Sequence, residues 1–526
     1  MNKIKTGVLV LIVTLLITGV FTTSFGYREV DGKKYLIWGA RQPVTVLDPS
    51  VYYDWSTRTL QQAVYDGLLK YVGKEIKPWL AKSYEANKNA DVWTFNLVKN
   101  AKFHNGDPVT AEAVKYSYTR TLELNQGPAW TFAEYLEPDG IEVVDKYTVK
   151  FHLKKPFAPF ASYVPWWYIM NPNQVEAHVQ NDDYGQEWLK ENEAGSGPFE
   201  INRWETGEFY WLNAVEDYWK GWPHEDHING FIFRLVREPA SQKLGIMQGE
   251  LDIVAGVSSD DFDVLADNPE IYVSEHPGAT TFGAKMNTQK GYTANRLIRT
   301  AMCYAMDYQS LLDIYGGHAI LEDSPFTPAT KGYVSLKEWA YRQDLDRAKE
   351  YMKMAGYPDG GFTLEYVYVA GFAEEESIGL VIKDSLSKIG INVKMIPLPW
   401  PQMVERGSKV ETSPDMMAVF TTPLTLDPDA VAFQYHPDSW GKYYGTEYYD
   451  NPRTAKLIKE ARVTADWEDR AKLYDEIQRL IYFDAPEIFG MIYNKRWAFR
   501  DWVKGFVYSP VRMTNEIDMY TFYIED

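Results

Sequence analysis

The chain has 526 residues, which is too many for one hydrophobic core, so two or three domains are expected. A charged content of 24% is ordinary for a globular protein, and the net charge of −19 makes nucleic acid or an anionic membrane face a poor partner. The 18 Trp, 38 Tyr and 24 Phe form a rich aromatic content. Large cores account for most of these rings and leave some to line a cleft.

Residues 1–26 have the pattern of a secretory signal peptide. Lys3 and Lys5 form a basic start, residues 7–21 are apolar but short for a membrane span, and small residues precede a cleavage point near Gly26. An uncleaved anchor is the alternative. The single cysteine, Cys303, excludes a disulfide within the chain, and without a cysteine after the signal we expect no lipid anchor.

A strand, a turn and a capped helix are predicted over residues 93–122. Trp93, Phe95 and Leu97 alternate with smaller or polar residues, which is typical of a strand with one buried face. The Asn105-Gly106 pair then forms a turn, because glycine adopts positive φ without steric cost. Thr110 is in the position of an N-cap, and apolar residues recur behind it with the spacing of one helix face.

Further elements follow in chain order. Strands are predicted at 34–40, twice within 143–153, at 362–369 and at 391–396. Gly356 is expected to close a helix before the strand at 362–369. The adjacent rings of Trp166, Trp167 and Tyr168 cannot all point into one core from a strand, because neighbours alternate faces. Trp400 lies among three prolines, which favours a fixed surface loop over a core position.

Motifs for catalysis or metal binding are weak. His224 and His227 are three residues apart in a polar loop, whereas a helical zinc pattern needs a spacing of four, so we expect no metal. Residues 194–198 do not form a nucleophile elbow, and no glycine-rich phosphate loop is present. We therefore predict a protein with no catalytic residues and no cofactor. A secreted glycosidase is the enzyme alternative, because it would also use aromatic subsites and paired carboxylates.

The run W-T-F-x-L-x-K-x-A-K-F-x-x-G-x-P-V-T-A-E-x-V at residues 93–114 resembles the signature of the family 5 extracellular solute-binding proteins, the large receptors of ABC importers. Other segments resemble the family in the same order, namely 46–49, 61–70, 75–84, 195–199, 217–223, 248–252, 297–307, 346–361, 388–396 and 426–429. The resemblance covers nearly the whole chain after the signal peptide.

The resemblance implies an α/β fold of the periplasmic-binding-protein type II-like class, with two halves joined by a hinge and an extra inserted lobe. It places lobe I at 27–67, 193–285 and 497–526, lobe II at 68–192 and lobe III at 286–496. The chain would cross between the halves near Met286 and Asn494. A ligand would be buried between halves that close on it. The receptor would be a periplasmic monomer that serves an ABC transporter membrane permease.

The ligand class is predicted from the lack of one acidic residue. Peptide receptors of the family have an aspartate shortly before a D-P-D motif, and it pairs with the ammonium of the peptide. The matching residues 420–426 contain no acid here. A buried ammonium without a counter-charge is costly, so the sequence favours a short neutral oligosaccharide, plausibly β-linked. An oligopeptide ligand is the alternative, because Asp415 or Asp427 could replace the missing aspartate.

A sugar site needs flat rings and planar polar groups. The resemblance places Trp400 on the cavity wall, and the predicted ligand-binding residues are Tyr53, Trp55, Trp130, Trp166, Trp167, Trp400, Phe420, Trp440, Tyr443 and Asn494. Further polar candidates are Asp54, Asn171, Asn173 and Gln402.

Overall fold

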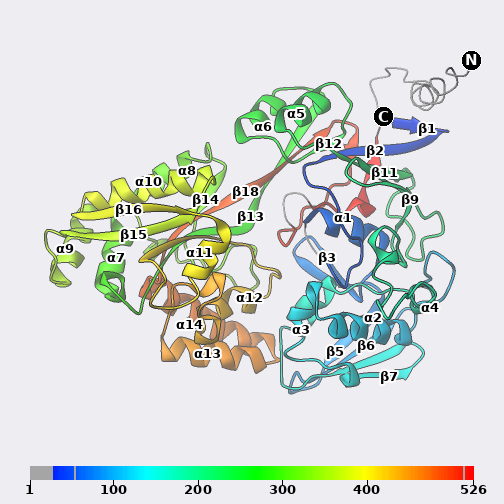
Figure 1. Cartoon of the computed structure of the whole chain (residues 1–526), viewed down its shortest axis with the longest axis horizontal. Helices are drawn as coiled ribbons and strands as arrows, with labels where there is room; N and C mark the ends of the chain where they lie inside the picture. Colours follow the sequence, from blue (N-terminus) through cyan, green and yellow to red (C-terminus); the bar gives the residue numbers. More distant parts are fainter. Residues whose placement is uncertain (1–27, 53–54, 513–515, 526) are drawn as a thin grey trace, which may run out of the picture.

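The structure is a computed structural model and describes residues 28–52, 55–512 and 516–525, so the predicted signal peptide lies outside it. Two bodies lie side by side and are joined by two long strands, β13 (Ile271–Met286) and β18 (Glu487–Arg500) (Figure 1). The mixed α/β architecture confirms the predicted fold class. We keep the names lobe I, lobe II and lobe III for the ranges given above, and their borders stay a prediction.

Lobe I is assembled from distant parts of the chain. Its core contains Leu36 and Trp38 from the first long strand, Phe231 and Phe233 from the middle of the chain, and Phe499 from β18. Its helices and strands are β1 (Arg28–Val30), β2 (Lys33–Ala40), α1 (Trp55–Val64), β9 (Phe199–Glu205), β10 (Phe209–Ala214), β11 (Gly230–Leu235), α5 (Pro239–Met247), β12 (Ile253–Val254), α6 (Ser259–Ala266), β19 (Val503–Lys504) and β20 (Tyr523–Ile524).

Lobe II contains the predicted strand, turn and helix. Trp93, Phe95 and Leu97 are buried on one face of β6, Gly106 takes a φ of +92°, and Thr110 is the N-cap, although its side chain accepts no capping hydrogen bond. The helix packs with a four-stranded sheet of order β5-β6-β8-β7. The elements are β3 (Leu69–Val72), β4 (Glu75–Pro78), β5 (Ala81–Ala86), β6 (Val92–Leu97), α2 (Ala111–Leu124), β7 (Ile141–Asp145), β8 (Thr148–His152), α3 (Phe160–Tyr163) and α4 (Pro172–Glu176).

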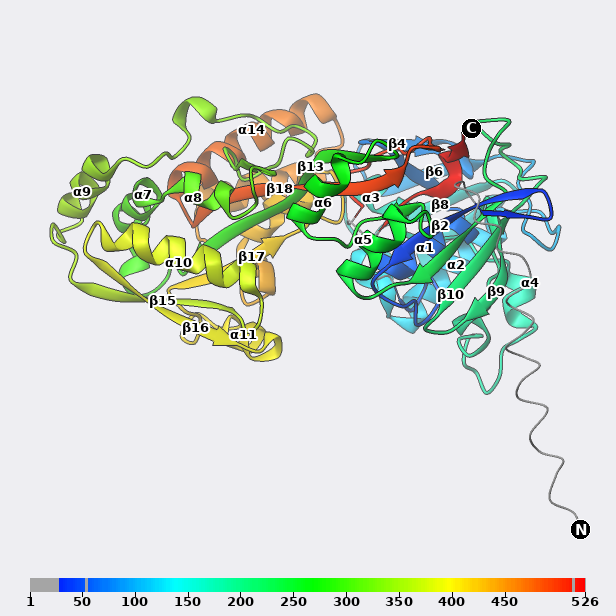
Figure 2. The ribbon, with the colours of Figure 1, turned by 90° about the horizontal axis from the view of Figure 1, so that it is seen from above.

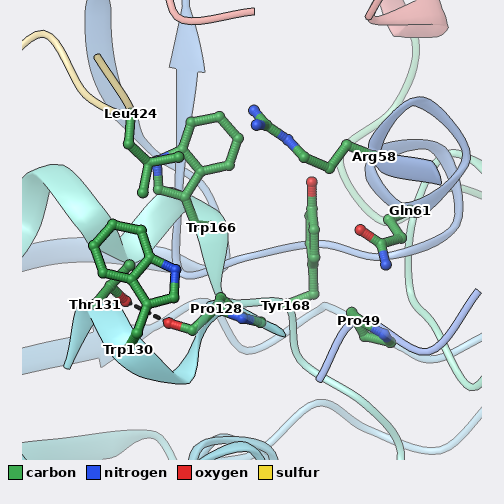
Figure 3. A pocket seen from close by; sticks show the side chains of 9 residues that line it. All are labelled: Pro49, Arg58, Gln61, Pro128, Trp130, Thr131, Trp166, Tyr168 and Leu424. Atoms are coloured by element: carbon green, nitrogen blue, oxygen red, sulfur yellow. Dashed lines mark hydrogen bonds between the residues drawn. The ribbon is translucent and has the colours of Figure 1, made fainter. Parts of the chain in front are cut away.

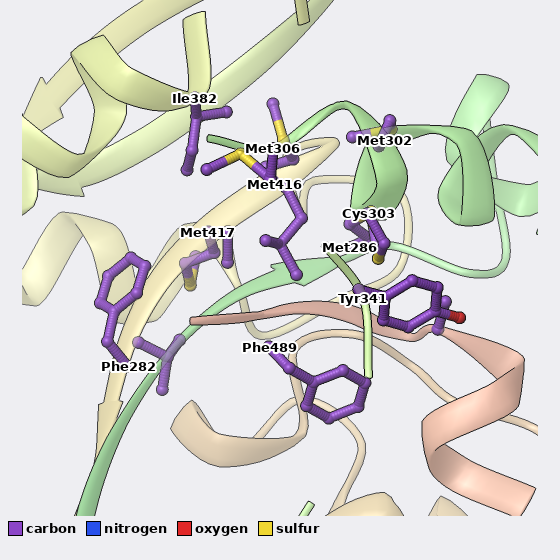
Figure 4. Close-up of a cluster of buried hydrophobic side chains, with 14 of the residues drawn as sticks. Phe282, Met286, Met302, Cys303, Met306, Tyr341, Ile382, Met416, Met417 and Phe489 are labelled. Atoms are coloured by element: carbon purple, nitrogen blue, oxygen red, sulfur yellow. The ribbon is translucent and has the colours of Figure 1, made fainter. Parts of the chain in front are cut away.

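Lobe III has the largest core, in which β13 and β18 contribute Phe282, Met286 and Phe489 beside the sulfur-rich side chains of α7 and β17 (Figure 4). Gly356 follows the end of α9 with a φ of +87°, as predicted. The elements are α7 (Arg296–Ala305), α8 (Tyr308–Asp313), β14 (Ala319–Leu321), α9 (Leu345–Met354), β15 (Phe362–Val369), α10 (Ala373–Ser387), β16 (Ile391–Leu398), α11 (Trp400–Arg406), β17 (Met416–Thr421), α12 (Asp429–Ala432), α13 (Pro452–Val463) and α14 (Trp467–Asp484).

One sheet runs through both bodies, in the order β16-β15-β17-β13-β18-β12-β2-β11-β10-β9. Its centre is the antiparallel pair of β13 and β18, which Figure 2 shows passing from one body to the other. The register shifts between Pro277 and Thr281, so the ladder is interrupted between the two halves. Asn494 pairs with Pro277 at this interruption, whereas Met286 lies in the core of lobe III. A bulge of this kind bends a strand and provides a place for a hinge.

Lobes II and III also touch each other away from these strands. The amide of Ala158 donates to the carbonyl of Arg462 at 2.8 Å, and the hydroxyl of Ser162 donates to Oγ1 of Thr425 at 3.4 Å. The two halves are therefore connected by the hinge strands and by a direct contact between lobes II and III. Over the described part of the chain, every helix falls short of the length or apolar character needed to cross a bilayer.

Candidate functional site

A cavity of about 920 Å³ lies between the two halves. Arg58 and Val511 line it from lobe I, a group of mostly aromatic residues lines it from lobe II, and Thr280 and Tyr493 line it from the two hinge strands. Most of the remaining lining comes from lobe III. A cavity of this volume, at the upper end of the range of about 300–1,000 Å³ for small-molecule sites, has room for a short oligomeric ligand.

The wall formed by lobes I and II contains two of the predicted tryptophans. Trp130 is exposed toward the cavity and follows the end of α2. The guanidinium of Arg58, on α1, lies 3.4 Å from the centroid of the Trp166 ring and forms an ion pair with Glu516 at 3.0 Å. Leu424 reaches a small recess in this wall from lobe III (Figure 3). The two halves thus meet at an apolar surface that includes Trp166 and Leu424, with the guanidinium of Arg58 beside it.

The wall formed by lobe III also contains partly exposed aromatic rings. Trp400 is 47% exposed, and its ring centroid lies 4.6 Å from that of Tyr443. Phe420, the last but one residue of β17, lies edge-on to Phe372, and both rings line the cavity. Trp400 is the first residue of α11 and not a loop residue as predicted, because Pro401 fits the first turn of a helix.

Charged groups of both signs line the same cavity. Glu374 and Glu375 are the second and third residues of α10, and Lys442 also faces the cavity from lobe III. Asp429 is buried beside Arg462, whose Nε lies 3.1 Å from Oδ1 of the carboxylate. Burial raises the pKa of Asp429 to about 6. The cavity is therefore not a neutral apolar slot.

The predicted site residues divide into three groups. Trp130, Trp400, Phe420 and Tyr443 line the cavity, and Trp166 lines the recess beside it. The residues placed elsewhere are Trp167, Trp440, Asn494, Asn171, Asn173 and Gln402. Tyr53 and Asp54 lie outside the described residues, and Trp55 is described only as the first residue of α1.

Trp167, Trp440 and Asn494 each have a different local partner. Trp167 is buried in the core of lobe II and donates through its indole nitrogen to Thr131 at 2.9 Å. Trp440 donates to the carbonyl of Tyr449 at 3.0 Å. Asn494 donates to Glu275 across the hinge strands at 2.5 Å. The ligand-binding role of the residues that do line the cavity is a proposal.

Two of the predicted polar candidates, Asn171 and Asn173, are engaged in the fold. Asn171 is buried, caps α4 and donates to Asp107 at 2.9 Å, and Asn173 donates to the same carboxylate at 3.3 Å. Gln402 is exposed on α11 but does not line the cavity. An asparagine in a polar turn more often satisfies its own backbone than a ligand, which explains the mismatch.

Sequence reasoning missed most of the charged lining and several rings. Glu374 and Glu375 lie in a run of three glutamates that reads as an ordinary acidic first turn of a helix. Tyr135, Phe157 and Tyr163 line the cavity from lobe II and were not singled out. The apolar and aromatic stretch at residues 157–172 was the available signal, since it contains two of these rings.

The described residues contain no group of three or more His, Cys, Asp or Glu side chains placed to hold a metal ion. The two histidines considered above contact aromatic rings. His227 stacks on Trp222 with the ring centroids 4.1 Å apart, and His224 packs at a tilt against Tyr523 with the centroids 4.2 Å apart. Cys303 is buried and has no disulfide partner.

Comparison with known proteins agrees with this architecture. The family described as "Bacterial extracellular solute-binding proteins, family 5 Middle" matches residues 75–443. The chain is 30% identical over 505 residues to the "Probable D,D-dipeptide-binding periplasmic protein DdpA" of Escherichia coli (strain K12), which covers 94% of this chain and 95% of the relative.

Two solved structures are similar over 94% of this chain. HbpA2 from Haemophilus parasuis has a TM-score of 0.84 at 24% identity and is covered completely. The periplasmic binding protein DppA from Helicobacter pylori, in complex with the peptide STSA, has a TM-score of 0.73 at 25% identity and is covered to 98%. Because the family match takes in well over half of the residues and the first relative aligns along almost its whole length, the chain belongs to the bacterial extracellular solute-binding proteins of family 5, the substrate-binding receptors of ABC importers.

Proposed function

We propose that this protein binds short peptides in the cavity between its halves and delivers them to the membrane permease of an ABC importer. It acts as a periplasmic monomer and catalyses no reaction. The observation that carries the proposal is the mixed lining of the cavity, where aromatic rings from both halves surround charged groups of both signs. A peptide has side chains for the rings and ionic termini for the charges, whereas a neutral sugar would offer no counter-charge to Glu374 and Glu375, the two lining acids for which the described residues provide no ion pair.

The relatives support this choice of ligand. One relative is named for D,D-dipeptides, and one similar structure holds a four-residue peptide. The oligosaccharide predicted from the sequence finds no support among them, and the peptide alternative fits better. The physical argument for sugar was that residues 420–426 contain no acid to pair with an ammonium. That argument loses its force because carboxylates reach the cavity from α10 and α12.

A thermal-shift panel tests the proposal. Protein freed of bound ligand by unfolding and refolding is mixed separately with dipeptides, tripeptides, tetrapeptides and β-linked oligosaccharides, and positive results are measured by calorimetry. A ligand at one hundred times its Kd stabilises the folded state by about 2.7 kcal/mol, which is easily detected. We expect stabilisation by peptides and none by sugars. Micromolar binding of a β-oligosaccharide with no response to any peptide would reject the proposal.

A further inference from the structure

Helix α10 presents two neighbouring carboxylates to the ligand cavity. Glu375 is only 3% exposed, and its Oε2 accepts a hydrogen bond from the amide of Val369 at 2.7 Å. Glu374 is exposed toward the cavity, which both residues line. The next residue, Glu376, does not line the cavity. Two of three consecutive acids are thus directed at the ligand space.

The two carboxylates differ from the other acids of the cavity because they lack a cation. Asp429 is paired with Arg462, and Glu134 is paired with Lys155. Within the described part of the chain, neither Glu374 nor Glu375 forms an ion pair, and no positive charge contributes to the pKa of either group. A carboxylate that is nine-tenths buried without a counter-charge is an unfavourable arrangement in the free protein.

The surroundings of this pair suit a cation. Burial raises the pKa of Glu375 to about 7, and the neighbouring charge of Glu374 adds to this shift. Tyr315 and Tyr443 also line the cavity. Burial raises the pKa of both phenols, and the negative charge of Glu375 adds to this shift, so the rings lie near it. Aromatic faces attract ammonium groups, and this attraction adds to that of a carboxylate.

We propose that Glu374 and Glu375 form the site that binds the α-ammonium group of the peptide. The inference rests on the proposed peptide function and adds to it the orientation of the ligand, with its N-terminus against lobe III at the start of α10. It also assigns the ammonium to residues about fifty positions earlier in the chain than the 420–426 segment. The consequence is selection against peptides whose amino group is blocked.

The test compares a free and a blocked peptide on three variants. The probe is the tightest-binding peptide of the panel described above, used with a free N-terminus and as its N-acetyl derivative, in calorimetry at pH 7.5. Glu374→Gln with Glu375→Gln removes both charges and keeps the side-chain shape, including an oxygen that can accept from Val369. Glu376→Gln is the matched control, because it removes one charge from the same helix turn outside the cavity.

Wild-type protein and the control should bind the acetylated peptide at least about thirtyfold more weakly than the free peptide, which corresponds to loss of a buried charge pair. The double variant should bind the free peptide more weakly by a similar factor and should no longer distinguish the two forms. If the double variant does not fold, Glu374→Gln alone, at an exposed position, should reduce the discrimination. A double or single variant that keeps the wild-type ratio of affinities for the free and acetylated peptides would overturn the inference and leave the peptide function intact. Wild-type protein that binds no peptide would overturn both.

Discussion

Nε of Arg462 lies 3.1 Å from Oδ1 of Asp429, and the same guanidinium lies over the rings of Phe433 in lobe III and Phe157 in lobe II, at 3.7 and 5.3 Å. The carbonyl of Arg462 accepts a hydrogen bond from Ala158, also in lobe II. One residue therefore neutralises a buried acid within its own lobe and contacts the opposite lobe. Its substitution should affect both stability and closure.

Replacement of Arg462 by alanine leaves Asp429 buried without its nearest cation, which is expected to lower the free energy of unfolding by about 3 kcal/mol. The variant should also be more open, because the stack on Phe157 is lost. Urea denaturation and small-angle scattering measure the two effects. Arg453→Ala is the control on the same helix, since its pair with Glu476 is exposed to solvent and should contribute less than about 1 kcal/mol. Equal stability of the two variants would contradict the expectation.

Trp400 is expected to contribute to ligand binding without contributing much to folding. Its ring is 47% exposed in the free cavity, next to Tyr443. Trp400→Ala should weaken binding by on the order of 2 kcal/mol, or about thirtyfold, through lost aromatic contact and buried area. Calorimetry measures this change. Trp339→Ala is the control, at 51% exposure in the same lobe but outside the cavity lining. An unchanged affinity would remove Trp400 from the binding site.

Ligand binding should bring the halves together about the hinge. The interrupted ladder between Pro277 and Thr281 allows bending with little loss of strand pairing, and the cavity is lined by both halves. Small-angle scattering should give a smaller radius of gyration with saturating peptide than without it. A scattering profile that does not change at saturation would argue against closure.

The free energy of unfolding of the ligand-free protein should depend on pH because of Glu375. Its pKa is raised from 4.5 to about 7, so between these pH values the Glu375 carboxyl is protonated in the folded state and ionised in the unfolded chain. The contribution of Glu375 to stability therefore falls as pH rises from 4.5 to about 7 and is constant above that. Glu375→Gln should be more stable than wild type by on the order of 2 kcal/mol at pH 8, with little difference at pH 4.5. Urea denaturation without ligand tests this. A difference independent of pH would mean that the charge is not the cause.

A buried ion pair holds lobe I to lobe II. Arg120 on α2 donates to both oxygens of Asp48, at 2.5 and 2.8 Å, and both side chains are fully buried. Asp48→Ala should lower the free energy of unfolding by about 3–5 kcal/mol, because it leaves the guanidinium buried and uncompensated. Chemical denaturation measures the loss. Asp260→Ala, a change at an exposed residue of α6, should have a much smaller effect.

Local pattern predicted much of the secondary structure and little of the site. The strands β2, β6 and β15 were predictable because alternating or continuous apolar residues have few other arrangements. Trp400 lines the cavity as predicted but is not in a loop, because one of the three prolines around it, Pro401, fits the first turn of a helix.

The charged part of the cavity could not be predicted because it depends on tertiary arrangement. An acid-rich first turn is common in helices, and nothing local distinguishes Glu375 from its neighbour Glu376. Their different surroundings arise only when α10 packs beside β15 and β16 and exposes one side of its first turn to the cavity. The lack of an acid at residues 420–426 therefore does not determine the charge of the cavity, because the fold brings carboxylates to it from several segments.

The shared sheet also has a consequence for biosynthesis. Lobe I takes its first long strand, β2, from the beginning of the chain and cannot be completed until β18 arrives, more than four hundred residues later. The four-stranded sheet of lobe II is contiguous and can form as soon as it is synthesised. Because β18 also belongs to the hinge, completion of lobe I and creation of the binding cleft are a single late event. A chain truncated before residue 487 should therefore retain a folded lobe II and have no capacity to bind ligand.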